Sequence, residues 1–552
     1  MVDKRPPPTP SCELLTHVNA PGECPGVAIG VSLLLHEILE REARTNASRI
    51  AVISGDRRLT YSQLAGRVED LAAALVALVP HGARVAVLAD NCIEYLEAYY
   101  AVPKAGMVMT VLNQRLHPSE LASIIDDVSP TVVLGQSKYV EPLRELRREL
   151  TSVQHWVGID AGGEEAFARF TTVRSGHSAR IVEFPVVDPE GTAWIIYTSG
   201  TTGHPKGAML SHEALTQTIQ STVYELGLRD GDSFLFPLPM CHIGGYLLLA
   251  IHLVGGTVLL QPRFTPNEWL ETVESERPTT SVLAPTMISM ILSSSELATR
   301  DISSLKWILY GASSIPGTVL AEAIARFGTD LQQGYGGTEM GGFICTLDSP
   351  SHHLAVTTSP DLLTSAGRPM HFIDVRVVDP DLHDVTVGQI GEVVVRGKQV
   401  MSGYWRNDDA TKEVFRGGWL HTGDLARLDQ AGHVHIVDRM NDMIVTGAEN
   451  VYPREVEDVL HRHPAVLEAA VFPIPDEHWV DAVTAAVVLR AGHAVETEAL
   501  IEHCRANLAS YKKPRLIVFM DELPKNATGK ILRREVRATV MQSVAGIPRP
   551  PE

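Results

Sequence analysis

Short apolar runs alternate with amphipathic stretches through most of the chain. The runs ARVAVLAD at residues 83–90 and TVVLG at residues 131–135 predict buried strands, and IEYLEAYYAV between them has the apolar spacing of a helix. Strands that alternate with helices form largely parallel sheets with helices on their faces. We therefore expect α/β layers over most of the chain.

The pattern changes near residue 390. The segments GEVVVRG, HVHIVDR and DMIVTG predict short strands joined by tight turns. After Tyr452 the order helix, strand, strand, helix predicts a small α+β unit. Because one hydrophobic core rarely serves 552 residues, we expect a large N-terminal α/β domain with a distorted β region, residues 1–440, and a small mobile α+β C-terminal domain, residues 441–552.

Composition excludes some classes of function. The formal net charge of −19 disfavours nonspecific binding to nucleic acid or to anionic membranes. The most apolar stretch, Tyr246–Leu260, contains His252 and two glycines, so it predicts a buried helix, turn and strand and not a membrane span. The six cysteines form no C-x-x-C pair, and we read no signal peptide at the start. We expect a cytoplasmic protein with small-molecule partners.

A glycine-rich loop, YTSGTTGHPKG at residues 197–207, follows the strand-like run AWII. Its backbone N–H groups, hydroxyls and lysine suit a phosphate group. The ATPase-type P-loop needs Gly-Lys followed by Ser or Thr, whereas this lysine lies between a proline and a glycine. A plain glycine-rich turn is the alternative. The candidate phosphate-binding residues are Thr198, Ser199, Gly200, Thr201, Thr202, Gly203 and Lys206.

Further segments carry candidate chemistry. They are FPLPMCHIGG (236–245), Gly311-Ala312-Ser313, YGGTE (335–339), WLHTGD (419–424), Arg439 and PKNATGK (524–530). A carboxylate such as Glu339 suits a hard cation beside phosphate oxygens, and Asp424 can accept bonds from two hydroxyls. Taken singly, Glu339 is more often a helix-cap acid, Lys530 a surface lysine and His242 a hydrogen-bonded core histidine.

In this order the segments resemble those of the acyl-adenylate-forming superfamily, which includes acyl-CoA synthetases, peptide-synthetase adenylation domains and beetle-type luciferases. The resemblance extends from about residue 35 to about residue 535. It implies that a carboxylic acid reacts with ATP to give an acyl-adenylate, and that the acyl group then passes to a thiol. ATP, Mg²⁺ and coenzyme A are the implied cofactor and substrates, and the C-terminal domain is expected to rotate between the two half-reactions.

The resemblance also assigns roles to residues. Thr338 contacts phosphate, Glu339 holds the metal, and Lys530 bridges carboxylate and phosphate in the adenylation transition state. Nucleotide contacts are implied for the phosphate-loop residues together with Gly311, Ala312, Ser313, Tyr335, Asp424 and Arg439. The implied coenzyme A tunnel contains Gly447, Ala448 and Glu449, and the implied hinge is Asn441.

The acyl pocket is predicted to take a medium, long or bulky acid. Acetate-type members have a tryptophan in the segment that corresponds to YGGTE (335–339), where this chain has glycine. The smaller residue leaves room for a larger acyl group. His242 is expected beside the substrate carboxylate. The predicted acyl-pocket residues are His242, Gly244, Gly245, Gly334, Gly336 and Gly337.

Local sequence features bear on the other branches of the superfamily. Met240-Cys241-His242 offers no carboxylate to pair with an amino-acid substrate. Only 85 residues separate Glu339 from Asp424, which leaves little room for the insertion typical of ligases that make fatty acyl-adenylates for a carrier protein. Luciferase chemistry shares the adenylation step and is not excluded by these motifs.

Cys241, Asn441 and Ala448 depart from the family pattern. A member that runs one half-reaction alone therefore stays open, as does a nucleotide- or acyl-AMP-binding protein without turnover. The acid, the thiol acceptor and a homodimeric state are not decided by the sequence.

Overall fold

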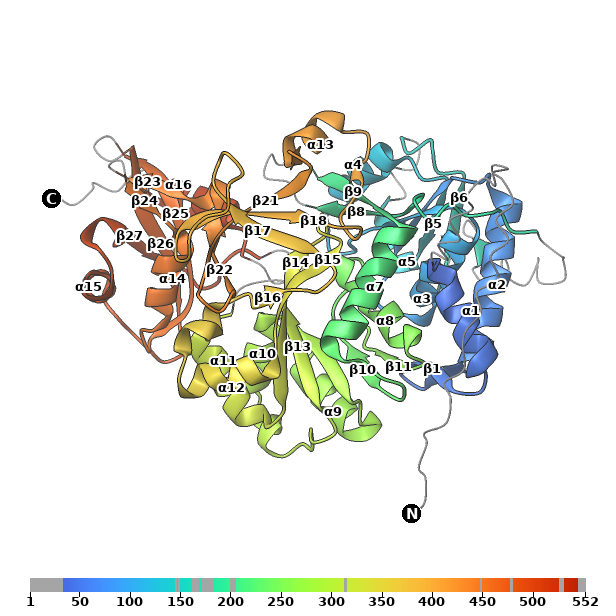
Figure 1. The fold of residues 1–552 in the computed structure, drawn as a ribbon, viewed down its shortest axis with the longest axis horizontal. Helices are drawn as coiled ribbons and strands as arrows, with labels where there is room; N and C mark the ends of the chain where they lie inside the picture. Colours follow the sequence, from blue (N-terminus) through green and yellow to red (C-terminus); the bar gives the residue numbers. More distant parts are fainter. Residues whose placement is uncertain are drawn as a thin grey trace, which may run out of the picture. The chain divides into compact units, whose positions relative to one another are not determined.

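The computed structural model describes residues 33–143, 146, 149–160, 168–169, 183–198, 205–311, 315–446, 449–476, 480–525 and 531–544. The strands within these residues form four sheets, which we name A to D. Figure 1 shows the helices and strands coloured along the chain.

Sheet A is mostly parallel. From β14 through β13, β12, β10 and β11 to β1, neighbouring strands run in the same direction, and antiparallel strands complete both edges. Its nine strands lie in the order β16 (Arg368–Pro369), β15 (Gly342–Leu347), β14 (Asp330–Gly337), β13 (Trp307–Gly311), β12 (Thr280–Leu283), β10 (Ser233–Phe236), β11 (Thr257–Leu260), β1 (Ile50–Ser54) and β2 (Arg57–Thr60).

Sheet B is parallel except at the edge formed by β8, β9 and β19. The antiparallel pair of β8 and β9 flanks the glycine-rich loop. Its eight strands lie in the order β19 (Gly403–Tyr404), β9 (Lys206–Ser211), β8 (Thr192–Thr198), β4 (Val108–Val111), β3 (Arg84–Leu88), β5 (Val132–Gly135), β6 (His155–Gly158) and β7 (Ala168–Arg169).

Sheets C and D are smaller. Sheet C is antiparallel and contains β17 (Asp374–Val378), β18 (Ile390–Arg396), β21 (Trp419–Leu428), β20 (Phe415–Arg416) and β22 (Val434–Arg439). Sheet D contains β24 (Glu449–Val451), β23 (Ile444–Thr446), β26 (Val480–Leu489), β25 (Val466–Asp476) and β27 (Leu516–Phe519), and only β27 joins it in parallel.

The helices cover the sheets, and no helix in the described ranges is both long and apolar enough to cross a membrane. The α-helices are α1 (Leu35–Thr45), α2 (Tyr61–Leu78), α3 (Ile93–Lys104), α4 (Pro118–Val128), α5 (Ser137–Val140), α7 (His212–Leu226), α8 (Tyr246–Leu253), α9 (Pro266–Glu276), α10 (Pro285–Leu292), α11 (Gly317–Phe327), α12 (Ser349–Thr357), α13 (Asp408–Val414), α14 (Pro453–His461), α15 (Thr497–Asn507) and α16 (Arg533–Val544). Short 3₁₀ turns are η1 (Glu141–Leu143), η3 (Ile243–Gly245), η4 (Ser295–Ala298), η5 (Pro360–Thr364), η6 (Met440–Asp442) and η7 (Ser510–Lys512).

The apolar stretch Tyr246–Leu260 forms a buried helix, a turn and a strand, as predicted. Helix α8 is buried from Tyr246 to His252. Its one strongly polar side chain, His252, is hydrogen-bonded to the Tyr100 hydroxyl at 2.8 Å and to the Ala51 carbonyl at 3.0 Å. His252 is therefore a satisfied core histidine and needs no ligand.

Alternation of side chains along β25 explains how sheet D is covered on both faces. Val471 packs with α14 and α15 on one face, and Phe472 packs with α16 on the other. These elements are the orange and red part of Figure 1. Sheets A to C are built from residues up to Arg439, and sheet D begins at Ile444.

The expected fold class is confirmed: the structure has a large N-terminal α/β domain and a small C-terminal α+β domain. The boundary at residues 440 and 441 stays a prediction.

Candidate active site

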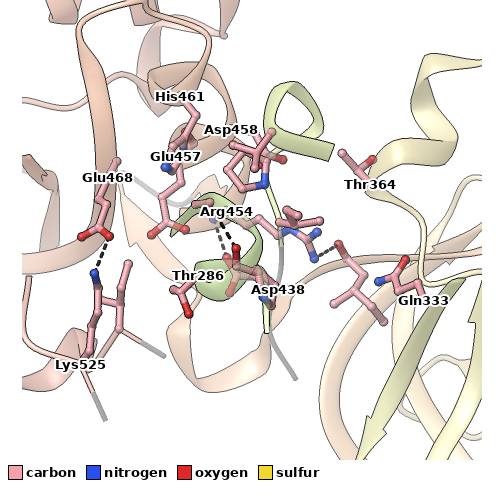
Figure 2. A pocket seen from close by; sticks show the side chains of 18 of the residues that line it. Thr286, Gln333, Thr364, Asp438, Arg454, Glu457, Asp458, His461, Glu468 and Lys525 are labelled. Atoms are coloured by element: carbon pink, nitrogen blue, oxygen red, sulfur yellow. Dashed lines mark hydrogen bonds and ion pairs between the residues drawn. The ribbon is translucent and has the colours of Figure 1, made fainter. Parts of the chain in front are cut away.

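A cavity of about 480 Å³ opens beside the carboxyl end of β14. Parallel α/β sheets commonly bind ligands outside the carboxyl ends of their strands. Figure 2 shows Lys525 paired with Glu468 at one side of the view, and Gln333 and Thr364 at the other. The cavity is lined by side chains from α10, β14, sheet C, α14 and the start of α16, among them Thr286, Gln333, Gly334, Tyr335, Gly336, Asp424, Ile436, Arg439, Arg454, Lys525, Ile531 and Arg533.

One corner of the cavity is formed by Asp424, Arg439 and Tyr335. The register of β21 and β22 pairs Asp424 directly with Arg439, and Arg439 Nε lies 3.2 Å from Asp424 Oδ1. The Tyr335 hydroxyl donates to Asp424 Oδ2 at 2.7 Å. Burial, reinforced by Asp424, raises the pKa of the Tyr335 phenol well above its ordinary value, so the phenol stays a donor. The pair leaves a buried carboxylate fixed at the cavity wall.

A second cluster of side chains joins the base of the glycine-rich loop to the segment YGGTE (335–339). Thr198 at the end of β8 and Lys206 at the start of β9 are register partners. The Thr198 hydroxyl donates to Glu339 Oε1 at 2.8 Å, and the Tyr404 hydroxyl donates to the same oxygen at 3.2 Å. Lys206 Nζ lies 5.3 Å from the centre of the Tyr404 ring. Three separate segments thus place two hydroxyls, a carboxylate and an ammonium together.

Thr338, predicted to contact phosphate, precedes Glu339 and is half-buried. The described contacts involve its backbone, whose carbonyl accepts from Gly341 N at 3.0 Å. Its predicted role in phosphate binding stays a prediction.

The loop that carries His242 is fixed by residues far away in sequence. The Asn91 amide donates to the carbonyls of Leu238 and Gln261 and accepts from Met240 N at 2.9 Å. The Tyr99 hydroxyl donates to the Met240 carbonyl. The sequence analysis missed Asn91, although an asparagine three residues after the end of a buried strand is a signal for a polar support of this kind.

His242 itself is half-buried, and its surroundings disfavour a charged ring. Burial, followed by the charge of Arg115, lowers the pKa of His242 to about 4. Its Nε2 atom is buried and has no hydrogen-bond partner among the described residues. A neutral imidazole with a free nitrogen is available to a ligand at this position.

The glycines predicted to open the acyl pocket differ in what surrounds them. A Cβ at Gly244 would meet nothing within 4 Å, and one at Gly337 would make ordinary contacts. At Gly245, Gly334 and Gly336 a Cβ would lie within 2.6 Å of the Tyr99 hydroxyl, the Phe343 ring and the Gly342 carbonyl, respectively. Close packing therefore accounts for glycine at these three positions, whereas Gly244 has open space beside it and Gly337 would accept a Cβ in ordinary contact.

Gly311 is also explained by close packing. It pairs with Gly334 across β13 and β14, and a Cβ on Gly311 would lie 2.5 Å from the Gly334 carbonyl oxygen. The glycine lets the two strands approach each other where they end at the cavity.

Several predicted site residues lie outside the described residues. They are Ser199, Gly200, Thr201, Thr202, Gly203, Ala312, Ser313, Gly447, Ala448 and Lys530. For Asn441 in η6 and Glu449 in β24, only the backbone is described. Lys525 and Ile531, which form a β-bridge on either side of residues 526–530, both line the cavity.

Arg533 carries an ion network that the sequence analysis missed. Its Nη2 lies 2.7 Å from Glu457 Oε2 on α14, and its Nη1 lies 2.9 Å from Asp442 Oδ2 in η6. The Asp438 carboxylate on β22 is 3.6 Å from the same Nη1 and accepts from Arg454 N at 2.8 Å. The network joins sheet C, the predicted hinge segment and the start of α16.

Comparison with known proteins supplies the family. Residues 39–405 match the model of the AMP-binding enzyme family, and residues 455–530 match its C-terminal domain. A feruloyl-CoA synthase from Amycolatopsis sp is 37% identical over 90% of this chain and 97% of its own length.

Two solved structures are similar over nearly the whole chain. The amide bond synthetase McbA from Marinactinospora thermotolerans matches with a TM-score of 0.82 and 31% identity, over 92% of this chain and 99% of that one. The anthranilate CoA ligase AuaEII in complex with anthranoyl-AMP matches with a TM-score of 0.84 and 27% identity, over 94% of this chain and 99% of that one. The expected resemblance is confirmed: this chain belongs to the AMP-binding enzyme family, the acyl-adenylate-forming enzymes.

Proposed function

We propose that this chain is an AMP-forming acyl-CoA ligase that activates a medium, long or bulky carboxylic acid and transfers the acyl group to coenzyme A. The observation that carries the proposal is the buried Asp424 carboxylate, which Arg439 and Tyr335 hold at the wall of a cavity of about 480 Å³. A carboxylate fixed in this way can accept bonds from both hydroxyls of a ribose.

In the proposed complex the triphosphate lies along residues 198–206. Thr198 and Lys206 flank the loop, and the lysine supplies charge. Glu339 and Thr198 offer oxygen ligands of the type that Mg²⁺ prefers, with Glu339 half-buried and held by two hydroxyls, so the residues present fit this ion. Mg²⁺ bound there would neutralise charge on the phosphates.

The proposed first step is attack of a substrate carboxylate oxygen on the α-phosphorus, with pyrophosphate leaving. Lys530 is the residue assigned to stabilise the charge that spreads over the oxygens in this transition state. In the second step the thiolate sulfur attacks the acyl carbon, a C–S bond forms, and AMP leaves with the bridging oxygen. His242, neutral at pH 7 because burial lowers its pKa to about 4, can hydrogen-bond a ligand through its uncharged ring.

Aromatic acids are the first substrates to test. The matched feruloyl-CoA synthase and anthranilate CoA ligase are both named for aromatic acids. Open space beside Gly244 suits a ring better than a closed pocket would. The described cysteines Cys92, Cys241, Cys345 and Cys504 are free thiols, which fits the cytoplasmic location that remains part of this proposal.

The experiment supplies purified protein with ATP, Mg²⁺, coenzyme A and a panel of acids from acetate to ferulate, anthranilate and long-chain fatty acids. Mass spectrometry follows acyl-CoA and AMP, with each synthetic acyl-AMP run in parallel. We expect acyl-CoA and AMP in equal amounts from at least one bulky acid, at a higher rate than from acetate. Acyl-CoA from supplied acyl-AMP alone would instead indicate a single half-reaction.

An amine is included as a second acceptor because one matched structure is an amide bond synthetase. Amide formation that outruns thioester formation would contradict the assignment of coenzyme A. Failure of every acid to exchange labelled pyrophosphate into ATP would contradict adenylation itself.

A further inference from the structure

Tyr404 lies where sheets A and B meet at the predicted phosphate-binding residues. Its strand, β19, pairs with β9 so that Tyr404 is opposite Ala208, two residues beyond Lys206. The next residue extends this contact, since Trp405 N donates to the Gly207 carbonyl at 2.7 Å. The backbone of residues 403–405 therefore fixes Tyr404 against the strand that leaves the glycine-rich loop.

The Tyr404 hydroxyl hydrogen-bonds the Glu339 carboxylate. It donates to Oε1 at 3.2 Å, and the Thr198 hydroxyl donates to the same atom at 2.8 Å. No described residue donates to Oε2. Two hydroxyls on one oxygen fix the plane of the carboxylate and leave the other oxygen for a ligand.

The Tyr404 ring makes a cation–π contact with Lys206. The ammonium lies 5.3 Å from the ring centre, within the range of a cation–π contact. Tyr404 is 7% exposed, so its ring is a well-packed support for a long flexible side chain. One buried residue thus contacts both an anionic and a cationic group of the predicted phosphate site.

We propose that Tyr404 is a positioning residue for the nucleotide: its hydroxyl orients Glu339 toward the metal and its ring holds Lys206 toward the phosphates. This inference rests on the proposed function, because it assumes that ATP and a divalent cation bind between these residues. The hydroxyl contact with Glu339 and the ring contact with Lys206 can be removed separately by substitution of Tyr404.

The test measures binding and does not need the acid. Mn²⁺ binding to the complex of enzyme and ATP is followed by electron paramagnetic resonance, and ATP binding without metal is measured by calorimetry in EDTA. For Tyr404→Phe we expect Mn²⁺ to bind about tenfold more weakly, since a hydrogen bond to a charged group is lost, with metal-free ATP affinity unchanged. For Tyr404→Leu we expect the same loss for Mn²⁺ and about fivefold weaker metal-free ATP binding.

Tyr100→Phe is the matched control. It also removes one buried phenol hydroxyl with a single partner, the His252 ring, and it lies in α3. We expect it to leave both affinities unchanged. In a Glu339→Gln background, Tyr404→Phe should have no further effect on Mn²⁺ binding, because its hydroxyl acts through that carboxylate.

Unchanged Mn²⁺ affinity in Tyr404→Phe would overturn the inference. So would an equal loss of metal-free ATP binding in that variant, because the hydroxyl would then support the fold of the site and not the carboxylate. Absence of ATP binding by the unaltered protein would count against the proposed function, which separates the two failures.

Discussion

At the scale of single residues, the burial and the partners of Asp424 distinguish it from an ordinary surface acid. In the sequence it is one acid in WLHTGD, and taken alone it is most simply a turn residue. In the structure it lies within strand β21, is 6% exposed and has a charged partner and a hydroxyl partner. Its carboxylate lines the cavity, with one oxygen beside Arg439 and the other bonded to the Tyr335 hydroxyl.

Asp424→Asn is expected to raise the KM for ATP by about tenfold, because the amide accepts more weakly than the carboxylate and loses its attraction to Arg439. In pyrophosphate exchange, 2′,3′-dideoxy-ATP should bind the unaltered enzyme as weakly as ATP binds the variant. The variant should not discriminate between the two nucleotides. Asp230→Asn is the control, since that carboxylate is exposed and, among the described residues, pairs with Arg49 alone. Retention of the full preference for ATP by Asp424→Asn would contradict the ribose assignment.

At the scale of elements, strands and helices were predicted best where burial dictates residue type. The strands at residues 84–88, 132–135 and 192–198 lie where runs of Val, Ile and Ala predicted them, because strands of parallel sheets are apolar on both faces. The extension of β21 through Gly423 and Asp424 was not foreseen. Its pairing with β22 compensates for two poor strand formers, and such pairing leaves no local signal in the sequence.

Because Arg533 joins α14, α16 and the predicted hinge segment, η6, in one ion network, we predict that these elements open together. Arg533→Met leaves Glu457 and the buried Asp438 without their cation, which costs about 3 kcal/mol for a pair of this burial. Hydrogen–deuterium exchange in Pro453–His461 should therefore speed up by about a hundredfold. Arg505→Met, which removes an exposed pair with Glu502, should change exchange there by less than about threefold. Equal exchange in the two variants would show that the network does not join these elements.

At the scale of the whole molecule, the family and the fold class could be predicted from the sequence, whereas the contacts around the candidate site residues could not. Motifs are local in sequence, and the order of several motifs identified the family before the fold was known. Asn91, Tyr404 and Arg533 act on residues 149, 65 and 91 positions away, respectively. Such contacts depend on how sheets A to D come together, which no local pattern specifies.

In the proposed mechanism the acid is activated as an acyl-adenylate before the thioester forms. The most direct measurement uses a carboxylic acid labelled with ¹⁸O in both carboxyl oxygens, together with ATP and coenzyme A. Because a carboxylate oxygen attacks the α-phosphorus and departs with AMP, mass spectrometry should find one ¹⁸O in AMP for each acyl-CoA formed and none in pyrophosphate. Unlabelled AMP, or label in inorganic phosphate with release of ADP, would contradict the account.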